Sequence, residues 1–159
     1  MSSHIVQIKS DLWKLTWEGL SKRSDGRIES LCIWAGQRSP DVSVVTEVIF
    51  LDGIEGVEGF ALFHRITREA TAQIFAILKD KGLQIVADVH THPGDWVGLS
   101  DTDREHPLEY RVGFISIVLP YFGRTDPMQE DIGMHRYEGN HQWHHMDEAE
   151  KLSALVVEE

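Results

Sequence analysis

Two apolar runs of strand length limit the folds open to this chain more than any other feature. They are LQIVADVHTH, residues 83–92, and VGFISIVLP, residues 112–120, and each is bounded by glycine or proline. Near-continuous apolar runs of this length are typical of central strands that are covered on both faces. The pattern predicts a sheet whose middle strands are buried between other layers.

The remaining segments predict helices and further strands around these two. Residues 10–26 have helix-like apolar spacing with Ser10 as a plausible N-cap, and residues 67–82 place apolar side chains on one helical face and end at Gly82. We expect strands at 27–37 and 41–53, a hairpin over 131–146, and a short helix or strand over 147–159. This order predicts an α/β fold, a single domain over residues 1–159 with a mixed central sheet flanked by helices.

Charge and composition narrow the classes of partner. The 159 residues include 26 acidic against 15 lysine and arginine side chains, a formal charge of -11. Such a surface repels phosphate backbones and anionic lipids, so we expect neither nucleic acid nor membranes as partners. Cys32 is the single cysteine, which excludes an intrachain disulfide and is typical of a reducing compartment. With no signal-peptide pattern and no apolar stretch near the roughly 18 residues that span a bilayer, the sequence predicts a cytoplasmic protein.

A group of histidine, serine and aspartate side chains follows the first apolar run. His90 and His92 are two residues apart, so on a strand their imidazoles project from the same face. Ser100 and Asp103 are three apart, and a Ser-capped helical turn would place both on one face. Two histidines and a carboxylate are ligands that leave a fourth tetrahedral position open, which is the catalytic arrangement of zinc. The spacing predicts a Zn²⁺ site with His90, His92 and Asp103 as ligands.

The pattern His90-x-His92, seven residues, Ser100, two residues, Asp103 resembles the signature of the JAMM metalloproteases, also called the MPN-plus or Mov34/JAB family. The resemblance implies the cytidine-deaminase-like JAB/MPN fold and a compact, prokaryotic-type member. It also implies zinc-dependent hydrolysis of an amide or isopeptide bond after the C-terminus of ubiquitin or a ubiquitin-like protein. By the same resemblance, Ser100 donates a hydrogen bond to the oxyanion, and Glu29 in the segment IESLCIWAG is the general base.

The identity of the base has a competitor. The family usually has a glycine three residues after this glutamate, where the chain has Cys32, and its strand is usually more aliphatic than one containing Trp34. Glu47, in the next expected strand, is the alternative to Glu29. Cys32 itself is interpreted as a packing residue because no histidine can be paired with it from the sequence.

Several other features of the sequence, and the function itself, have more than one interpretation. The segment HQWHH holds His141, His144 and His145, but without a carboxylate or cysteine at ligand spacing we interpret it as a surface hairpin. Trp96 either lines a groove for a substrate tail or closes the core. The alternative functions are a peptidase that trims a sulfur-carrier protein, a metallohydrolase of small amides, and a non-catalytic MPN scaffold.

Overall fold

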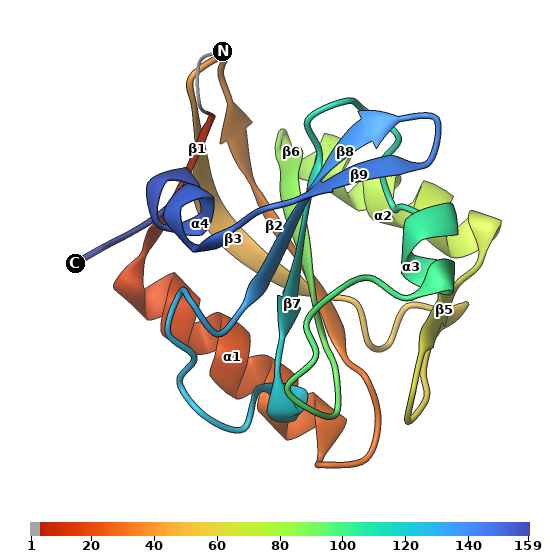
Figure 1. The fold of residues 1–159 in the computed structure, drawn as a ribbon. Helices are drawn as coiled ribbons and strands as arrows, with labels where there is room; N and C mark the ends of the chain where they lie inside the picture. The colour runs from red at the N-terminus through yellow and green to blue at the C-terminus, as the bar shows by residue number, and fades with distance from the viewer. Residues whose placement is uncertain (1–3) are drawn as a thin grey trace.

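An eight-stranded mixed sheet forms the middle of the computed structural model, which describes residues 4–159 (Figure 1). In spatial order its strands are β10 (Leu155–Glu158), β1 (Ile5–Lys9), β3 (Val42–Phe50), β2 (Leu31–Arg38), β6 (Gln84–Thr91), β7 (Ile115–Leu119), β8 (Gly133–Gly139) and β9 (Gln142–His145). β6 is antiparallel to β2 and parallel to β7. Nearly every residue of β6 and β7 is buried, which confirms their prediction as central strands.

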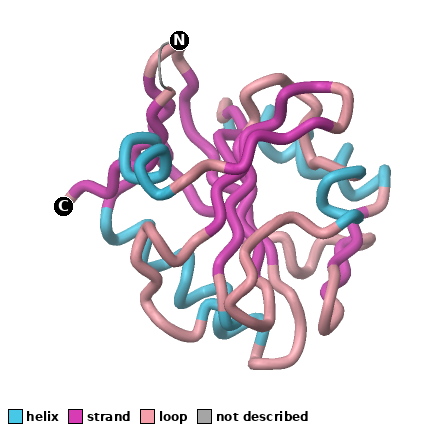
Figure 2. Tube along the Cα trace, viewed as in Figure 1, coloured by secondary structure: helices cyan, strands magenta, loops and turns pink. Residues whose placement is uncertain are grey.

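Helices cover both faces of this sheet, as Figure 2 shows. On one face, α1 (Ser10–Ser24) and α4 (Glu148–Ala154) pack apolar residues such as Trp13 and Leu20 against the sheet. On the other face, α2 (Arg68–Lys81) packs Ile74 and Leu78 into a second apolar cluster. The predicted α/β class, one mixed sheet flanked by helices, is therefore confirmed.

The turn after α2 determines where β6 begins. Gly82 has a positive φ of 68° and its N–H bonds to the carbonyls of Leu78 and Lys79, which ends the helix. A glycine tolerates this left-handed conformation without the steric cost that a β-carbon brings. The chain enters β6 two residues later, at Gln84, and runs toward His90 and His92 at the far end of the sheet.

The strands formed by the two ends of the chain differ from the sequence prediction. β1 precedes the first helix and pairs in parallel with both β10 and β3. The C-terminal segment, predicted as a helix or a strand, contains both, because α4 is followed by β10. Ser10 is the first residue of α1, and Lys9 occupies the N-cap without a side-chain bond. Ser10 does not cap the helix because β1 runs directly into it.

A small separate sheet was also absent from the prediction. β4 (Val57–Gly59) and β5 (His64–Ile66) form a two-stranded antiparallel hairpin between β3 and α2. A short helix, α3 (Asp101–Glu105), follows the loop after β6. Both lie on the right in Figure 1. Within residues 4–159, no helix is both long and apolar enough to pass through a membrane.

Candidate metal centre

His90 and His92 lie side by side where β6 ends. His90 is in register with Leu31 of β2 and with Val118 of β7, so two neighbouring strands hold its backbone. The N–H of His92 continues this pairing with a bond to the Leu119 carbonyl at 2.9 Å. Both histidines are buried, and their Nε2 atoms are 3.2 Å apart. The predicted same-face arrangement is therefore present in the structure.

Asp103 reaches the same point from α3. Its backbone N–H donates to Ser100 Oγ at 3.1 Å, and its Oδ2 accepts from the Ser100 N–H at 3.0 Å. This reciprocal capping box fixes the first turn of a short helix and with it the direction of the Asp103 carboxylate. Asp103 Oδ2 lies 3.3 Å from His90 Nε2 and 3.4 Å from His92 Nε2.

These three atoms fit a small tetrahedral metal ion. Bonds of about 2.0–2.1 Å from one ion to imidazole nitrogen and carboxylate oxygen place tetrahedral donors roughly 3.3–3.4 Å from one another. The three separations in the structure are 3.2, 3.3 and 3.4 Å. Two imidazoles and one carboxylate also form a donor set that borderline metal ions prefer. We conclude that this cluster of His90, His92 and Asp103 can hold a metal ion.

The tautomer of His92 is set by a backbone contact. Its Nδ1–H donates to the Trp96 carbonyl at 3.1 Å, which leaves Nε2 as the atom that faces the cluster. The Trp96 indole stacks on the His92 ring with centroids 5.2 Å apart. Such outer contacts orient a ligating imidazole and raise its basicity. With 58% of its surface exposed, Trp96 flanks the site and does not close the core.

Electrostatic coupling joins His90 to Asp103. Burial acts to lower the pKa of His90, but the charge of Asp103 and a hydrogen bond to it outweigh this and raise the pKa to about 9. Burial acts to raise the pKa of Asp103, but the charge of His90 and a hydrogen bond from it hold that pKa well below its usual range. The metal-free pair is therefore charged at neutral pH, and a metal ion would displace the proton from His90.

Glu29 lies beside the three donor atoms, and one of its oxygens is close enough to His90 and His92 to form a group of possible metal ligands with them. Its Oε2 is 3.9 Å from His92 Nε2, and its side chain is 2% exposed. It sits two residues before β2, where its N–H bonds to the Phe60 carbonyl at 2.8 Å. A buried carboxylate at this distance can contact a molecule held at the metal centre.

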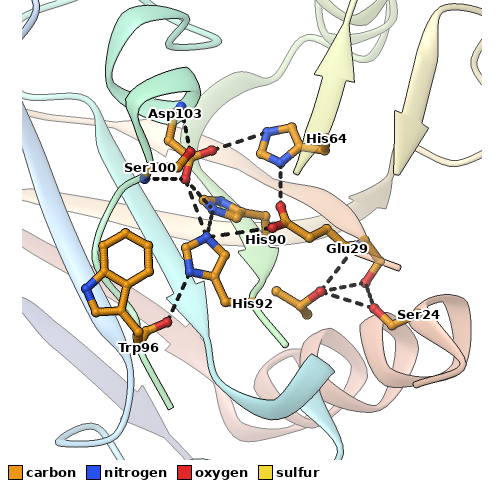
Figure 3. A network of polar contacts seen from close by, with 10 residues as sticks. Ser24, Glu29, His64, His90, His92, Trp96, Ser100 and Asp103 are labelled. Atoms are coloured by element: carbon orange, nitrogen blue, oxygen red, sulfur yellow. Dashed lines mark hydrogen bonds and ion pairs between the residues drawn. The ribbon is translucent and has the colours of Figure 1, made fainter. Parts of the chain in front are cut away.

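His64 is part of the site although nothing in the sequence pointed to it. Its Nδ1 donates to Glu29 Oε1 at 2.9 Å, and its Nε2 is 3.8 Å from Asp103 Oδ1 (Figure 3). The His64 ring also lies against that of His90, with centroids 4.8 Å apart. His64 thus connects the glutamate to the aspartate from β5. The only signal available was a histidine in a segment without clear periodicity, which is too weak to identify a site residue.

Hydroxyl groups hold the segment that carries Glu29 against β6. Ser30 Oγ donates to the Leu20 carbonyl at 2.8 Å and contacts Ser24 Oγ at 2.7 Å. The Ser30 N–H donates to Thr91 Oγ1 at 3.0 Å. Because Thr91 lies between the two histidines in sequence, these bonds position Glu29 relative to both of them.

Comparisons with known proteins bear on the fold. No family model matches the sequence. A protein from Desulfitobacterium hafniense, known from a solution structure, is similar with a TM-score of 0.67 and 12% identity over 98% of this chain and 94% of its own. A JAB1/MPN domain protein from Archaeoglobus fulgidus is similar with a TM-score of 0.51 and 18% identity over 98% of this chain and 100% of its own. The chain has the JAB1/MPN fold.

A third similar structure describes a JAMM metalloprotease-like zinc site in the proteasome and signalosome, with a TM-score of 0.49 and 17% identity over 96% of this chain and 98% of its own. The fold assignment rests on the structure from Archaeoglobus fulgidus, while the chemistry of the site depends on the side chains described above.

Within this JAB1/MPN fold, the competing glutamate lies outside the candidate centre. Glu47, on β3, forms an ion pair with Lys81 at 2.9 Å, and 38% of its side chain is exposed. Cys32 is fully buried in β2, and burial followed by the charge of Asp88 raises the pKa of its thiol well above the usual value. A thiol in this environment is a packing group.

The histidines of HQWHH form the predicted hairpin. β8 and β9 turn at Asn140 and His141, both of which have positive φ. His145 Nδ1 is 2.7 Å from Nδ1 of His135, and His144 bonds to Glu150 at 2.6 Å. Within the described residues, groups with metal-ligand geometry draw only on Glu29, His64, His90, His92 and Asp103.

Proposed function

We propose that this protein is a zinc-dependent peptidase of the JAMM type that hydrolyses the amide or isopeptide bond after the C-terminus of ubiquitin or a ubiquitin-like protein. The observation that carries the proposal is the triangle of donor atoms from His90, His92 and Asp103 with a buried glutamate 3.9 Å away. The JAB1/MPN fold supports it, as does the open fourth position of a three-ligand metal site.

The chain itself would supply the proton transfers. When bound, zinc provides a Lewis acid that polarises the scissile carbonyl and lowers the pKa of water. Glu29 accepts the proton from the attacking water and passes it to the leaving amine, because its Oε2 faces the donor triangle from one side. Its other oxygen is held by His64, so the carboxylate keeps one orientation.

Ser100 has one hydrogen free for the reacting carbonyl. Its Oγ accepts the Asp103 N–H, and this capping bond uses a lone pair of the hydroxyl and leaves its own proton available. That proton can be donated to the oxygen that becomes negative as the carbonyl is attacked. Loss of one such donor typically lowers turnover by about 10²–10³-fold.

The unpaired edge of the β4–β5 hairpin, beside the metal centre, favours an extended protein tail as the substrate. β5 carries His64 into the site, and the β4–β5 hairpin pairs with no other strand of the described chain. An extended peptide can add to such an edge through main-chain hydrogen bonds. Leu62, at the hairpin tip, is 75% exposed and offers an apolar contact for the body of a partner protein.

The proposal is tested by incubating the zinc-loaded protein with fusions in which a ubiquitin-like modifier ending in Gly-Gly precedes a reporter. Cleavage is read by intact mass, with and without a chelator. We expect cleavage after the second glycine in the zinc-loaded protein, and no cleavage after chelation. An activity that survives removal of the metal would contradict the proposal.

The glutamates provide a matched pair of variants. We expect Glu29→Gln to retain zinc and to lose turnover by about 10²–10⁴-fold, because the amide cannot accept the proton. Glu47→Gln removes a glutamate that is paired with Lys81 on the surface, so it should keep both zinc and turnover. Equal activity of Glu29→Gln and the unmodified protein would remove Glu29 from the mechanism.

A further inference from the structure

A cavity lies at the opposite end of the sheet from the metal centre. Its volume is about 770 Å³, and its wall includes residues where β2 ends and β6 begins. Gln84, on its wall, is six residues before His90 on β6, which places the two about 20 Å apart along the strand. The cavity is therefore separate from the proposed catalytic machinery.

Three arginines from different segments line this cavity. Arg38 is the last residue of β2, Arg111 lies in the segment before β7, and Arg136 is in β8. Within residues 4–159, neither Arg38 nor Arg111 has a carboxylate within 4.0 Å, and Arg136 has only Glu138 at 3.8 Å. In a chain with a formal charge of -11, two neighbouring arginines without a close acidic partner are unexpected.

Two guanidinium nitrogens in this group are buried without partners. Arg38 Nη1 and Arg111 Nε are inaccessible to solvent and form no hydrogen bond with the described residues. Burial, and then the nearby charge of Arg38, lowers the pKa of Arg111. A buried donor without an acceptor destabilises a protein, so an acceptor brought by a bound molecule would be favourable at both nitrogens.

The rest of the wall is mostly apolar. Val86 and Ile115 from the sheet, Met146 after β9, and Ala149 and Ala154 around α4 all line the cavity. Glu150 is the one acidic residue on the wall, and it is already bonded to His144 and to the Asp147 N–H. Because Arg136 is paired with Glu138 at 3.8 Å, Arg38 and Arg111 are the two positive charges on the wall that have no carboxylate of the described chain within 4.0 Å. An anion with two negative charges and an apolar body matches such a wall.

From this wall we infer that the cavity binds a small molecule in which a phosphate monoester is attached to an apolar or aromatic body. A phosphate monoester has a charge of about -1.5 to -2 at neutral pH, and guanidinium groups bind phosphate oxygens through paired hydrogen bonds. The volume lies within the range of about 300–1,000 Å³ that is typical of small-molecule sites. A carboxylate would neutralise only one of the two charges.

The binding test uses adenosine 5′-monophosphate and phenyl phosphate as probes, with adenosine and inorganic phosphate as matched partial ligands. Calorimetry on the full chain should show that at least one monoester binds at least about tenfold more tightly than either partial ligand. Equal binding of adenosine and its monophosphate would overturn the inference. So would the absence of binding by both monoesters at about millimolar concentration.

Variants locate the binding in this cavity. Arg111→Gln and Arg38→Gln should each weaken monoester binding by about tenfold or more, whereas Arg27→Gln, at an exposed arginine paired with Asp25, should not change it. Unchanged binding in both cavity variants would contradict the inference.

A stability measurement separates ligand binding from a structural role. Without ligand, Arg111→Gln should unfold at an equal or higher temperature than the unmodified protein, because it removes a partly buried guanidinium beside Arg38 whose Nε has no partner. A purely structural arginine would instead lower the unfolding temperature when replaced. Zinc content and cleavage should stay unchanged in this variant, so failure of the peptidase proposal would leave this result intact.

Discussion

At the scale of single residues, we expect the hydrogen bond from His64 to Glu29 to contribute to turnover. We expect His64→Ala to keep its metal and lower kcat by about 10–100-fold, because the Glu29 carboxylate loses the donor that orients it. His64→Asn should recover part of kcat, since its amide can donate from nearly the same position as Nδ1. Steady-state kinetics with metal analysis checks both variants, and equal kcat for alanine and asparagine would assign His64 a packing role only.

Ser100 combines a structural and a proposed chemical role, and two substitutions separate them. Ser100→Ala removes the cap of α3 and should cost about 1 kcal/mol, whereas Ser100→Gly should cost only a few tenths. If the hydroxyl donates to the reacting carbonyl, both variants should lose turnover by a similar 10²–10³-fold, in the range found for single donors of this kind. If the loss of turnover instead parallels the loss of stability in the two variants, Ser100 acts only as the cap of α3.

The extent to which the site could be predicted depends on how local each contact is. His90 and His92 follow from strand alternation, and Asp103 follows from helical spacing after a capping serine, so all three could be placed from the sequence. His64 could not, because its position depends on a hairpin whose pairing joins residues far from the motif. Glu29 was identified only through resemblance to a family, and its burial beside His92 is a property of the tertiary structure.

At the scale of elements, the buried strands and the long helices were predictable, whereas the strands formed by the two chain ends and the shortest strands were not. β6 and β7 are continuous apolar runs, and α2 has both a capping Thr67 and a terminal Gly82, so local signals agree with the fold. β10 is a short edge strand, and β1 lies between it and β3, so both strands depend on pairing between distant parts of the chain. The three-residue strands β4 and β5 are too short for a periodic pattern to define them.

The β8–β9 hairpin supports the loop beside the metal centre through His135, which gives a pH prediction. His135 Nε2 donates to the Val97 carbonyl at 2.9 Å, and burial, partly offset by this bond, lowers its pKa to about 4. In the unfolded chain the pKa of histidine is about 6.5. Between pH 6.5 and 4 the unfolded state therefore binds a proton that the folded state does not, and the free energy of unfolding falls as the pH falls.

This contribution can be isolated by denaturant unfolding at a series of pH values. Because His135 contributes up to about 1.4 kcal/mol per pH unit in this window, His135→Gln should show a shallower decline below pH 6.5 than the unmodified protein. The substitution also removes a contact and so changes the free energy of unfolding at every pH. Only the slope of that free energy against pH is therefore compared between the two proteins. Identical slopes would show that His135 gains its proton with the same ease in both states.

At the scale of the whole molecule, the candidate centre lies at the margin of two apolar cores that do not include its ligands. One core packs under α1 and α4 and the other under α2, and His90, His92 and Asp103 belong to neither. The JAB1/MPN fold is therefore stabilised mainly by burial, which contributes about 25 cal/mol for each Å² of apolar surface removed from water. We expect the metal to add to this stability without being needed for the chain to fold.

Metal removal tests this separation of folding from binding. Because a ligand that binds only the folded state adds about 4 kcal/mol at a thousandfold excess over its Kd, chelation of the zinc-loaded protein should lower Tm by about 10 °C. Circular dichroism should remain that of the folded chain, since both cores persist. Glu29→Gln should show the same shift and Asp103→Asn little or none, because only Asp103 supplies a donor atom to the triangle. A Tm that is equal with and without zinc would show that the three side chains do not bind the ion. Loss of the folded spectrum on chelation would show that the two cores alone do not keep the chain folded.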